Sequence, residues 1–198
     1  MIYRVAHFSD FHLRRADKNL DRAIALIAHA LGPDVGAEHV VVAGDIVDLA
    51  SIRIVRRFVD GLKGLGLGGP SRVTVVPGNH DIFPASKRPP FVRISRPTSL
   101  WNRFCDATRF ARRGRGCRQL LRGEPFPVGK VLSDDVVLAA VDSTRNQMID
   151  PRDWCSGELV EEHIDAVGEF FDAHLDKKHR IVVMHHCVWE EESENARF

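Results

Sequence analysis

Cysteine is scarce in this chain, and long apolar runs are missing. The four cysteines among 198 residues lie far apart and form no CxxC pair, which argues against a zinc ribbon or a disulfide framework and indicates reduced thiols. No stretch approaches the ~20 apolar residues of a transmembrane helix, and the start MIYRVAHFSD lacks the basic and apolar regions of a signal peptide. We therefore expect a cytoplasmic protein without a transmembrane segment.

Charge is balanced over the whole chain but not along it. The formal net charge is +1, whereas the segment 87–122 holds eleven Lys and Arg residues and a single acid, Asp106. Such a block is either a solvated face or a surface selected by an anionic ligand. The surrounding Arg/Pro-rich stretch, 84–127, is bounded by prolines. We interpret it as an insertion or cap over one edge of a single domain that spans 1–198.

Short apolar runs alternate with helix-like segments. Runs rich in Val, Ile and Ala predict buried strands at 3–8, 39–43, 72–76, 136–141 and 180–184. Amphipathic patterns predict helices at 19–31, 51–62, 98–112 and 158–175, and Ser51 is placed to cap the second of these. Strands that alternate with helices predict an α/β fold with a largely parallel arrangement.

Polar side chains follow each predicted strand. In chain order, the strands lead into SDFH, GDIVD, GNHD, DST and a pair of histidines. In open α/β sheets, ligands bind beyond the carboxyl ends of the strands, so these side chains are expected to converge on one crevice. Taken alone, SDFH and GDIVD are ordinary turn sequences, GNHD is a stronger signal, and the paired histidines would suit a buried, hydrogen-bonded pair. Their order, with one motif after every strand, indicates a shared site.

The residue types in these motifs suit a pair of metal ions. Carboxylates, imidazoles and an amide oxygen are ligands for divalent manganese, iron or zinc. Asp10 and His12, two residues apart at a strand end, would hold one ion together. Asp45 would lend its two oxygens to two ions, and Asn79 and His185 would bind the other ion. Two metals about 3.5–4 Å apart would activate a water for phosphoryl transfer.

The ordered set DxH, GDxxD, GNHD and a strand-terminal histidine resembles the calcineurin-like metallophosphoesterase superfamily. The HFSDFHL, VDST and VMHH segments look most like its bacterial branch of cyclic-nucleotide and related phosphodiesterases. The resemblance implies a four-layer αββα sandwich with a dinuclear site. It also implies that Asp10, His12 and Asp45 hold the first metal, and that Asp45, Asn79 and His185 hold the second.

The resemblance assigns further roles around the metals. His80 would lie beside the substrate phosphate, as a donor to its oxygens or a general acid to the leaving group. Asp81 would orient that imidazole and favour its protonated form. Asp48 would brace its loop rather than bind metal. Asp142 and His186 are candidates for a position behind the ligands.

Two departures from the family pattern stand out. Cys187 and Val188 occupy positions where this branch usually has prolines, and the closing GHxH motif, which would give each metal one more imidazole, does not occur. The chain is cut short relative to its relatives, or another subunit of a homo-oligomer completes the site, or the protein is degenerate. We favour the first explanation, in which the sandwich lacks its C-terminal strands.

The leading hypothesis is a metal-dependent phosphodiesterase that hydrolyses a small nucleotide-type or similar anionic diester through a two-metal-activated hydroxide. The basic segment 87–122 would steer or cap this substrate. A competing hypothesis is a nuclease of the DNA-repair exonuclease type. Nucleic acid is not the favoured partner, because only Trp101, Phe104 and Phe110 lie among the arginines as stacking residues. Two further hypotheses are a lipid-precursor pyrophosphatase at a membrane surface and a non-catalytic phosphate-binding or interaction module.

Overall fold

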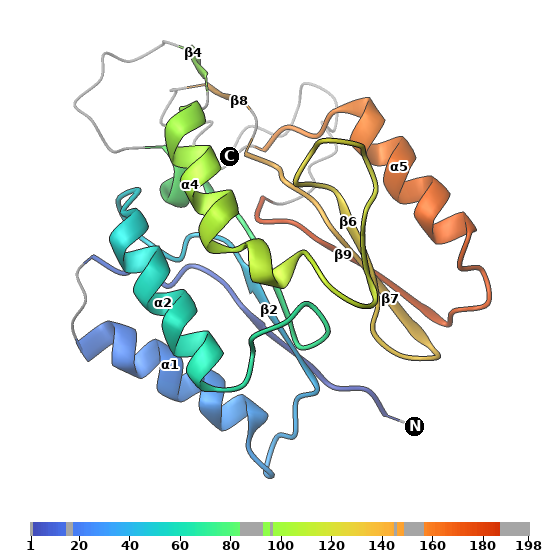
Figure 1. The fold of residues 1–198 in the computed structure, drawn as a ribbon, viewed down its shortest axis with the longest axis horizontal. Coiled ribbons are helices and arrows are strands. Elements are labelled where there is room, and N and C mark those ends of the chain that lie inside the picture. The colour runs from blue at the N-terminus through green and yellow to red at the C-terminus, as the bar shows by residue number, and fades with distance from the viewer. Residues whose placement is uncertain are drawn as a thin grey trace, which may run out of the picture.

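Two β-sheets and five α-helices make up the computed structural model of the chain (Figure 1), which describes residues 2–14, 18–83, 93–95, 97–144, 146–148 and 157–186. The strands are β1 (Val5–Phe8), β2 (His39–Ala43), β3 (Val73–Val76), β5 (Cys117–Gln119), β6 (Val128–Val131), β7 (Val136–Ala140) and β9 (His179–Val183), with a separate small ladder of β4 (Arg93–Ser95) and β8 (Asn146–Met148). The helices are α1 (Lys18–Leu31), α2 (Ile52–Gly64), the short α3 (Asn79–Ile82), α4 (Thr98–Ala107) and α5 (Glu161–Asp172), with one 3-10 turn, η1 (Arg109–Ala111). None of the described helices combines the length and apolar character needed to cross a bilayer.

The first sheet is parallel and has the order β1-β2-β3. Val5 lies opposite His39, and Val40 lies opposite Val73. Every residue of β2 and β3 is buried, as expected for β-branched parallel strands that are covered on both faces. Because the three strands run in the same direction, their carboxyl ends meet at one edge of the sheet, where the polar motifs follow.

The second sheet has the order β5-β6-β7-β9, in which the first three strands are antiparallel and β9 joins β7 in parallel. Helix α5 covers its outer face, where Val167 and Phe170 cluster with Val137 and Ala139 of β7. Leu138 points away from its two neighbours on β7 and joins the main core instead. The two sheets are therefore packed together through the inward-facing side chains of β7.

Side chains of the segment 97–127 take part in the main core. Trp101 and Phe104 of α4 and Phe126 before β6 are at most 9% exposed and cluster with Phe58 of α2. Helix α4 packs beside α2 (Figure 1), and β5 forms the end of the second sheet. The described part of this arginine-rich segment is thus built into the layers of the sandwich.

The four-layer α/β sandwich expected from the sequence is confirmed, with helices outside two central sheets. The five predicted strands correspond to β1, β2, β3, β7 and β9, and the four predicted helices to α1, α2, α4 with η1, and α5. The largely parallel arrangement is wrong for the second sheet, where β5, β6 and β7 are antiparallel. Ser51 does occupy the N-cap position of α2, but its side chain makes no capping hydrogen bond.

A buried lysine connects the two sheets. Lys130 of β6 is 1% exposed, and its Nζ donates to the carbonyls of Val73 at 2.7 Å and Ala111 at 2.7 Å and to Thr74 Oγ1 at 2.8 Å. The Thr74 hydroxyl also bonds His39 Nε2 at 2.8 Å. Burial lowers the pKa of Lys130 to about 7 and that of His39 to about 4. This polar chain runs from β6 through β3 to β2.

Candidate metal centre

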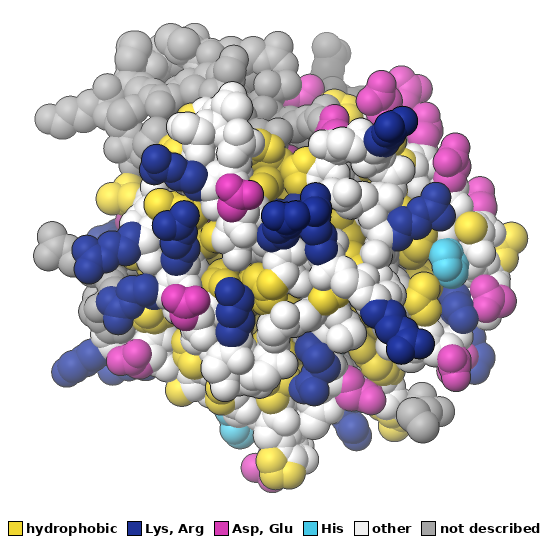
Figure 2. Space-filling model, in the orientation of Figure 1, with side chains coloured by type: hydrophobic (Ala, Val, Ile, Leu, Met, Phe, Trp, Pro, Cys, Tyr) yellow, Lys and Arg dark blue, Asp and Glu magenta, His cyan; other side chains and the backbone are white. Residues whose placement is uncertain are grey.

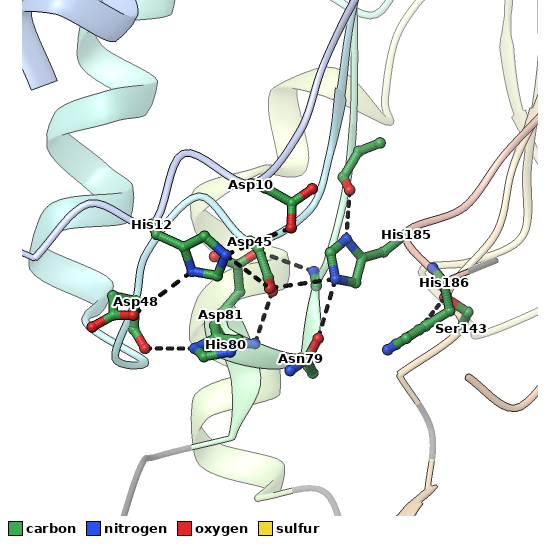
Figure 3. Close-up of polar contacts among 12 residues, drawn as sticks. Asp10, His12, Asp45, Asp48, Asn79, His80, Asp81, Ser143, His185 and His186 are labelled. Carbon is green, nitrogen blue, oxygen red and sulfur yellow. Dashed lines mark hydrogen bonds and ion pairs between the residues drawn. The ribbon is translucent and has the colours of Figure 1, made fainter. Parts of the chain in front are cut away.

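The candidate ligands gather at the carboxyl ends of the first sheet's strands, as Figure 3 shows. Asp10 and His12 follow β1, Asp45 follows β2, Asn79 begins α3 directly after β3, and His185 follows β9 of the second sheet. The structure therefore brings together residues that are up to 175 positions apart in the chain. These residues meet at the edge between the two sheets.

Asp45 lies at the centre of the group. The residue is 3% exposed, and its Oδ2 is 3.4 Å from His185 Nε2 and 3.8 Å from His12 Nε2. Its Oδ1 accepts a hydrogen bond of 2.9 Å from the main-chain N–H of His80. Burial alone would raise the pKa of Asp45, but the hydrogen bond and charge of His185, followed by the contacts with His80, lower it overall. The result is a buried carboxylate that is ionised and flanked by imidazoles.

Asp10 and His12 occupy a loop that runs beside the loop of Asp45. The Nε2 of His12 is 3.6 Å from Asp10 Oδ1. The main-chain N–H of Asp10 donates to Gly44 O at 3.2 Å, and that of His12 donates to Asp45 O at 3.0 Å. These bonds continue the pairing of β1 with β2 beyond the strands. The Asp10 side chain is 54% exposed, so this side of the group is open to a ligand.

His185 is held by a main-chain contact on its far side. Its Nδ1 donates to Ala43 O at 2.8 Å, so its Nε2 is directed at Asn79 Oδ1, 3.1 Å away, and at Asp45. Burial would lower the pKa of His185, but the hydrogen bond and charge of Asp45 raise it to about 8. A cation at Nε2 would replace this proton. A carbonyl that fixes the tautomer of a histidine is a common partner of metal-binding imidazoles, so His185 fits a ligand role.

His80 and Asp81 are positioned by the main chain of their neighbours. The Nδ1 of His80 donates to Asp48 O at 2.7 Å. The Asp81 carboxylate accepts hydrogen bonds from Gly78 N at 3.0 Å and Val47 N at 3.1 Å, and burial raises its pKa to about 7. The expectation that Asp81 orients the imidazole is corrected here: the Asp48 carbonyl makes that contact, and Asp81 fastens the two loops together.

Asp48 braces its loop, in line with its expected role. Its Oδ2 pairs with Arg14 Nε at 3.0 Å, and its Oδ1 is 3.7 Å from His12 Nδ1. With its carbonyl bonded to His80, Asp48 contacts two of the candidate imidazoles. Arg14 was not singled out in the sequence. Its position two residues after His12 is the signal that could have indicated a contact with this site.

The residues expected behind the ligands are buried. Asp142 Oδ1 accepts hydrogen bonds from the N–H of Thr144 at 2.9 Å and from its hydroxyl at 2.6 Å. His186 Nδ1 bonds Ser143 Oγ at 2.8 Å, and its ring centroid lies 4.8 Å from that of His185. Burial, and then the charge of His185, lower the pKa of His186 to about 4. His186 therefore packs as a neutral ring against the candidate ligand, whereas Cys187 and Val188 lie outside the described residues.

Two glycines allow the loops to approach one another. A Cβ at Gly78 would lie 2.2 Å from Asp45 N and Oδ1, and a Cβ at Gly44 would lie 2.6 Å from Gly78 N and 2.7 Å from His185 Nδ1. Gly44 also has a φ of +84°, which side chains rarely adopt. These contacts explain why glycine precedes both Asp45 and Asn79 in the motifs.

Among the residues that the structure describes, potential ligand atoms fall into two groups, each within 4.8 Å, and both groups include Asp45. One consists of His12, Asp45 and His80, and the other of Asp10, Asp45 and His185. The resemblance instead pairs Asp10 with His12 and adds Asn79 beside His185. The donors of both groupings are carboxylate oxygens and imidazole nitrogens, with the amide oxygen of Asn79 added in the second, and all three kinds suit divalent manganese, iron or zinc. Asp45 is the residue that the two groups share.

A comparison with protein-family models matches residues 3–197 to the model described as calcineurin-like phosphoesterase. The match covers nearly the whole chain and all the candidate ligands. No curated protein matches the chain.

Proposed function

Because the chain belongs to the calcineurin-like phosphoesterase family, we propose that it is a metal-dependent phosphodiesterase that hydrolyses a small nucleotide-type or similar anionic diester. The family implies metal-dependent hydrolysis of phosphoesters. The observation that carries the proposal is the ionised, buried Asp45 carboxylate between the Nε2 atoms of His12 and His185. A cytoplasmic location stays a prediction, and completion of the site by a second subunit stays one of the alternatives.

The residues present fit two divalent ions. We assign Asp10, His12 and Asp45 to one ion and Asp45, Asn79 and His185 to the other. When bound, the two ions would activate a water as nucleophile and neutralise charge on the phosphoryl oxygens. The chain's own contribution is to keep Asp45 ionised and to direct His185 Nε2 inward through the Nδ1 bond to the Ala43 carbonyl.

His80 is the proposed acid of the reaction. Since its Nδ1–H is held by the Asp48 carbonyl, a second proton would sit on Nε2. The imidazolium can then donate to a phosphoryl oxygen or protonate the leaving alcohol. Asp81 supports this position indirectly, because it joins Gly78, in the loop that carries His80, to Val47, in the loop of Asp45 and Asp48.

The choice of a diester rests on the sequence. The HFSDFHL, VDST and VMHH segments resemble phosphodiesterases, and the basic segment 87–122 suits an anionic substrate. Turnover of a cyclic nucleotide can be compared with turnover of an aryl phosphomonoester at equal manganese concentration. We expect the larger kcat/KM for the cyclic nucleotide, and a clear preference for the monoester would reject the diester assignment.

Hydrolysis of bis(4-nitrophenyl) phosphate with added manganese tests the catalytic roles. We expect Asp45→Ala to remove activity and His80→Ala to lower kcat by about 10²–10⁴-fold. Asp165→Ala, which removes an exposed carboxylate from α5, is the control and should leave kcat unchanged. Calorimetric titration with manganese distinguishes a hydrolase from a binding module, because wild-type protein that binds the ion without turnover would be the latter.

A further inference from the structure

One face of the molecule carries a large excess of positive charge. We call it the basic face and define it by the exposed cations of α2, α4, η1 and the loop that follows: Arg53, Arg56, Arg57, Lys63, Arg103, Arg109, Arg113 and Arg115. Only Asp60 and Asp106 oppose them on these elements, so the basic face has a net charge of +6. Since the chain has a formal net charge of +1, its other residues must sum to −5. Figure 2 shows Lys and Arg spread over α2 and α4, with acidic side chains gathered around α5.

Within the part of the chain that the structure describes, the cations of the basic face form no ion pair with a carboxylate. Among the described residues, no arginine of the basic face pairs with a carboxylate, unlike Arg14 with Asp48. Lys63 Nζ lies 5.4 Å from the centroid of the Phe110 ring. Eight exposed cations on neighbouring helices and the loop after η1 repel one another unless a counter-charge is supplied. The basic face is therefore suited to a ligand that carries several negative charges.

A hollow of about 200 Å³ lies at the carboxyl end of α4, lined by Arg109, Arg112 and Arg113 together with Asp106. Arg112 is 5% exposed, and its guanidinium donates to the carbonyl of Pro125 at 3.3 Å and to that of Cys105. Burial lowers the pKa of Arg112. A phosphate group in this hollow would meet two exposed guanidinium groups with a third, buried one behind them.

The basic face offers charge without apolar anchors. Trp101 and Phe104, the large aromatic side chains of α4, are 9% and 1% exposed and point into the core. The large hydrophobic residues that the structure shows as exposed lie on neither α2 nor α4. A stacking platform for single-stranded bases needs exposed aromatics, and insertion into a membrane needs exposed apolar side chains. Both partners are therefore disfavoured relative to a rigid phosphate backbone.

We propose that the basic face binds the phosphate backbone of double-stranded nucleic acid without reading its bases. A duplex presents one negative charge per about 1.7 Å of its axis, and guanidinium groups match phosphate geometry. Helix α2, with 13 residues, is about 20 Å long, so its cations face several successive phosphates. This surface requires neither the metal centre nor hydrolysis, and it therefore stands or falls independently of the proposed phosphodiesterase activity.

The test is the salt dependence of duplex binding by the full chain, in EDTA so that no cleavage occurs. Fluorescence anisotropy of a labelled 20-base-pair duplex is followed from 50 to 200 mM KCl. Four phosphate contacts give a log–log slope of about −3.6, which is roughly a 150-fold loss of affinity over this range. Arg109→Gln/Arg113→Gln should reduce that loss to roughly 12-fold, because two contacts disappear.

The matched control is Arg22→Gln/Lys178→Gln, which removes two exposed cations from α1 and from the turn before β9. It should bind the duplex as wild type does, and both double variants should unfold at the wild-type temperature. The proposal is overturned if the duplex does not bind at 50 mM KCl, or if the two double variants bind it equally. Tighter binding of a single strand of the same length, or arginine-dependent binding of anionic phospholipid vesicles in place of the duplex, would equally overturn it.

Discussion

Replacing Gly78 with alanine is a direct test of how the metal centre is assembled. An ideal Cβ at this position would lie 2.2 Å from both the amide nitrogen and Oδ1 of Asp45, and 2.8 Å from its Cγ. Ordinary contact with a Cβ begins at 3.4 Å, so the new methyl group and Asp45 must move apart by the difference, about 1.2 Å. Since one of the obstructing atoms is a main-chain nitrogen, a change of rotamer cannot relieve the clash.

The expected consequence is a large loss of activity in a protein that still folds. Asp45 would shift relative to His12 and His185, whose Nε2 atoms now lie 3.8 and 3.4 Å from its Oδ2. A displacement of about 1 Å in an active site can cost on the order of 10²-fold, so we expect kcat/KM for the aryl diester to fall at least about 100-fold. Overpacking of this kind costs about 1–3 kcal/mol of stability, less than the usual total of about 5–15 kcal/mol.

Gly168→Ala is the matched control. Gly168 lies on α5, and a Cβ there would have no neighbour within 4 Å, so alanine should stabilise the helix by about 0.5–1 kcal/mol and leave kcat/KM unchanged. Both variants would be compared by steady-state kinetics, by calorimetric titration with manganese and by thermal unfolding. Activity and manganese affinity of Gly78→Ala within threefold of wild type would refute the argument that this close contact holds Asp45 in place.

Three further predictions concern the core. Phe104→Ala should lower the free energy of unfolding by about 3–5 kcal/mol in urea titrations, because the ring is 1% exposed; an unchanged value would place α4 outside the cooperative core. Burial lowers the pKa of His39 to about 4, so the folded state favours the neutral imidazole. The stability that this contributes, up to roughly 3 kcal/mol, is present above pH 6.5 and is lost as the pH falls to about 4. Between pH 6.5 and about 4, the free energy of unfolding of His39→Gln should fall less than that of wild type by this amount. An equal fall in the two proteins would contradict the assignment. Lys130→Met should cost about 1–3 kcal/mol, because it leaves buried carbonyls without a donor, whereas a gain in stability would mean that desolvation of the ammonium outweighs its hydrogen bonds.

The candidate ligands could be located from the sequence because each stands directly after a run of β-branched residues. Asp45 follows HVVVA and Asn79 closely follows VTVV, and strands of this composition are reliably recognised as buried. Parallel pairing then places the strand ends together. The contacts of Asp81 could not be obtained in this way. It neighbours His80 in the chain, but both lie on the helical turn α3, where adjacent side chains do not face each other.

In the second sheet, strand β6 and its buried lysine could not be predicted from the sequence. Strand β6 reads VGKV, in which a lysine and a glycine hide the apolar pattern, and a lysine is ordinarily expected at the surface. Lys130 is buried because its acceptors come from β3 and its flanking loop, up to 60 residues away in the chain, and from η1. No local pattern carries that information, since the partners exist only after the two sheets have packed.

Backbone strain connects the fold to the proposed chemistry. Among the described residues, the non-glycine residues with positive φ are Asp10 at 57°, His12 at 45° and Asp45 at 50°, and all three are candidate ligands. A left-handed conformation costs roughly 1–2 kcal/mol for each such residue, and it persists only where the surroundings enforce it. Here the enforcement comes from the hydrogen bonds of Asp10 N to Gly44 O and of His12 N to Asp45 O. The stability of the packed sheets thus offsets the cost of a preformed ligand geometry at Asp10, His12 and Asp45.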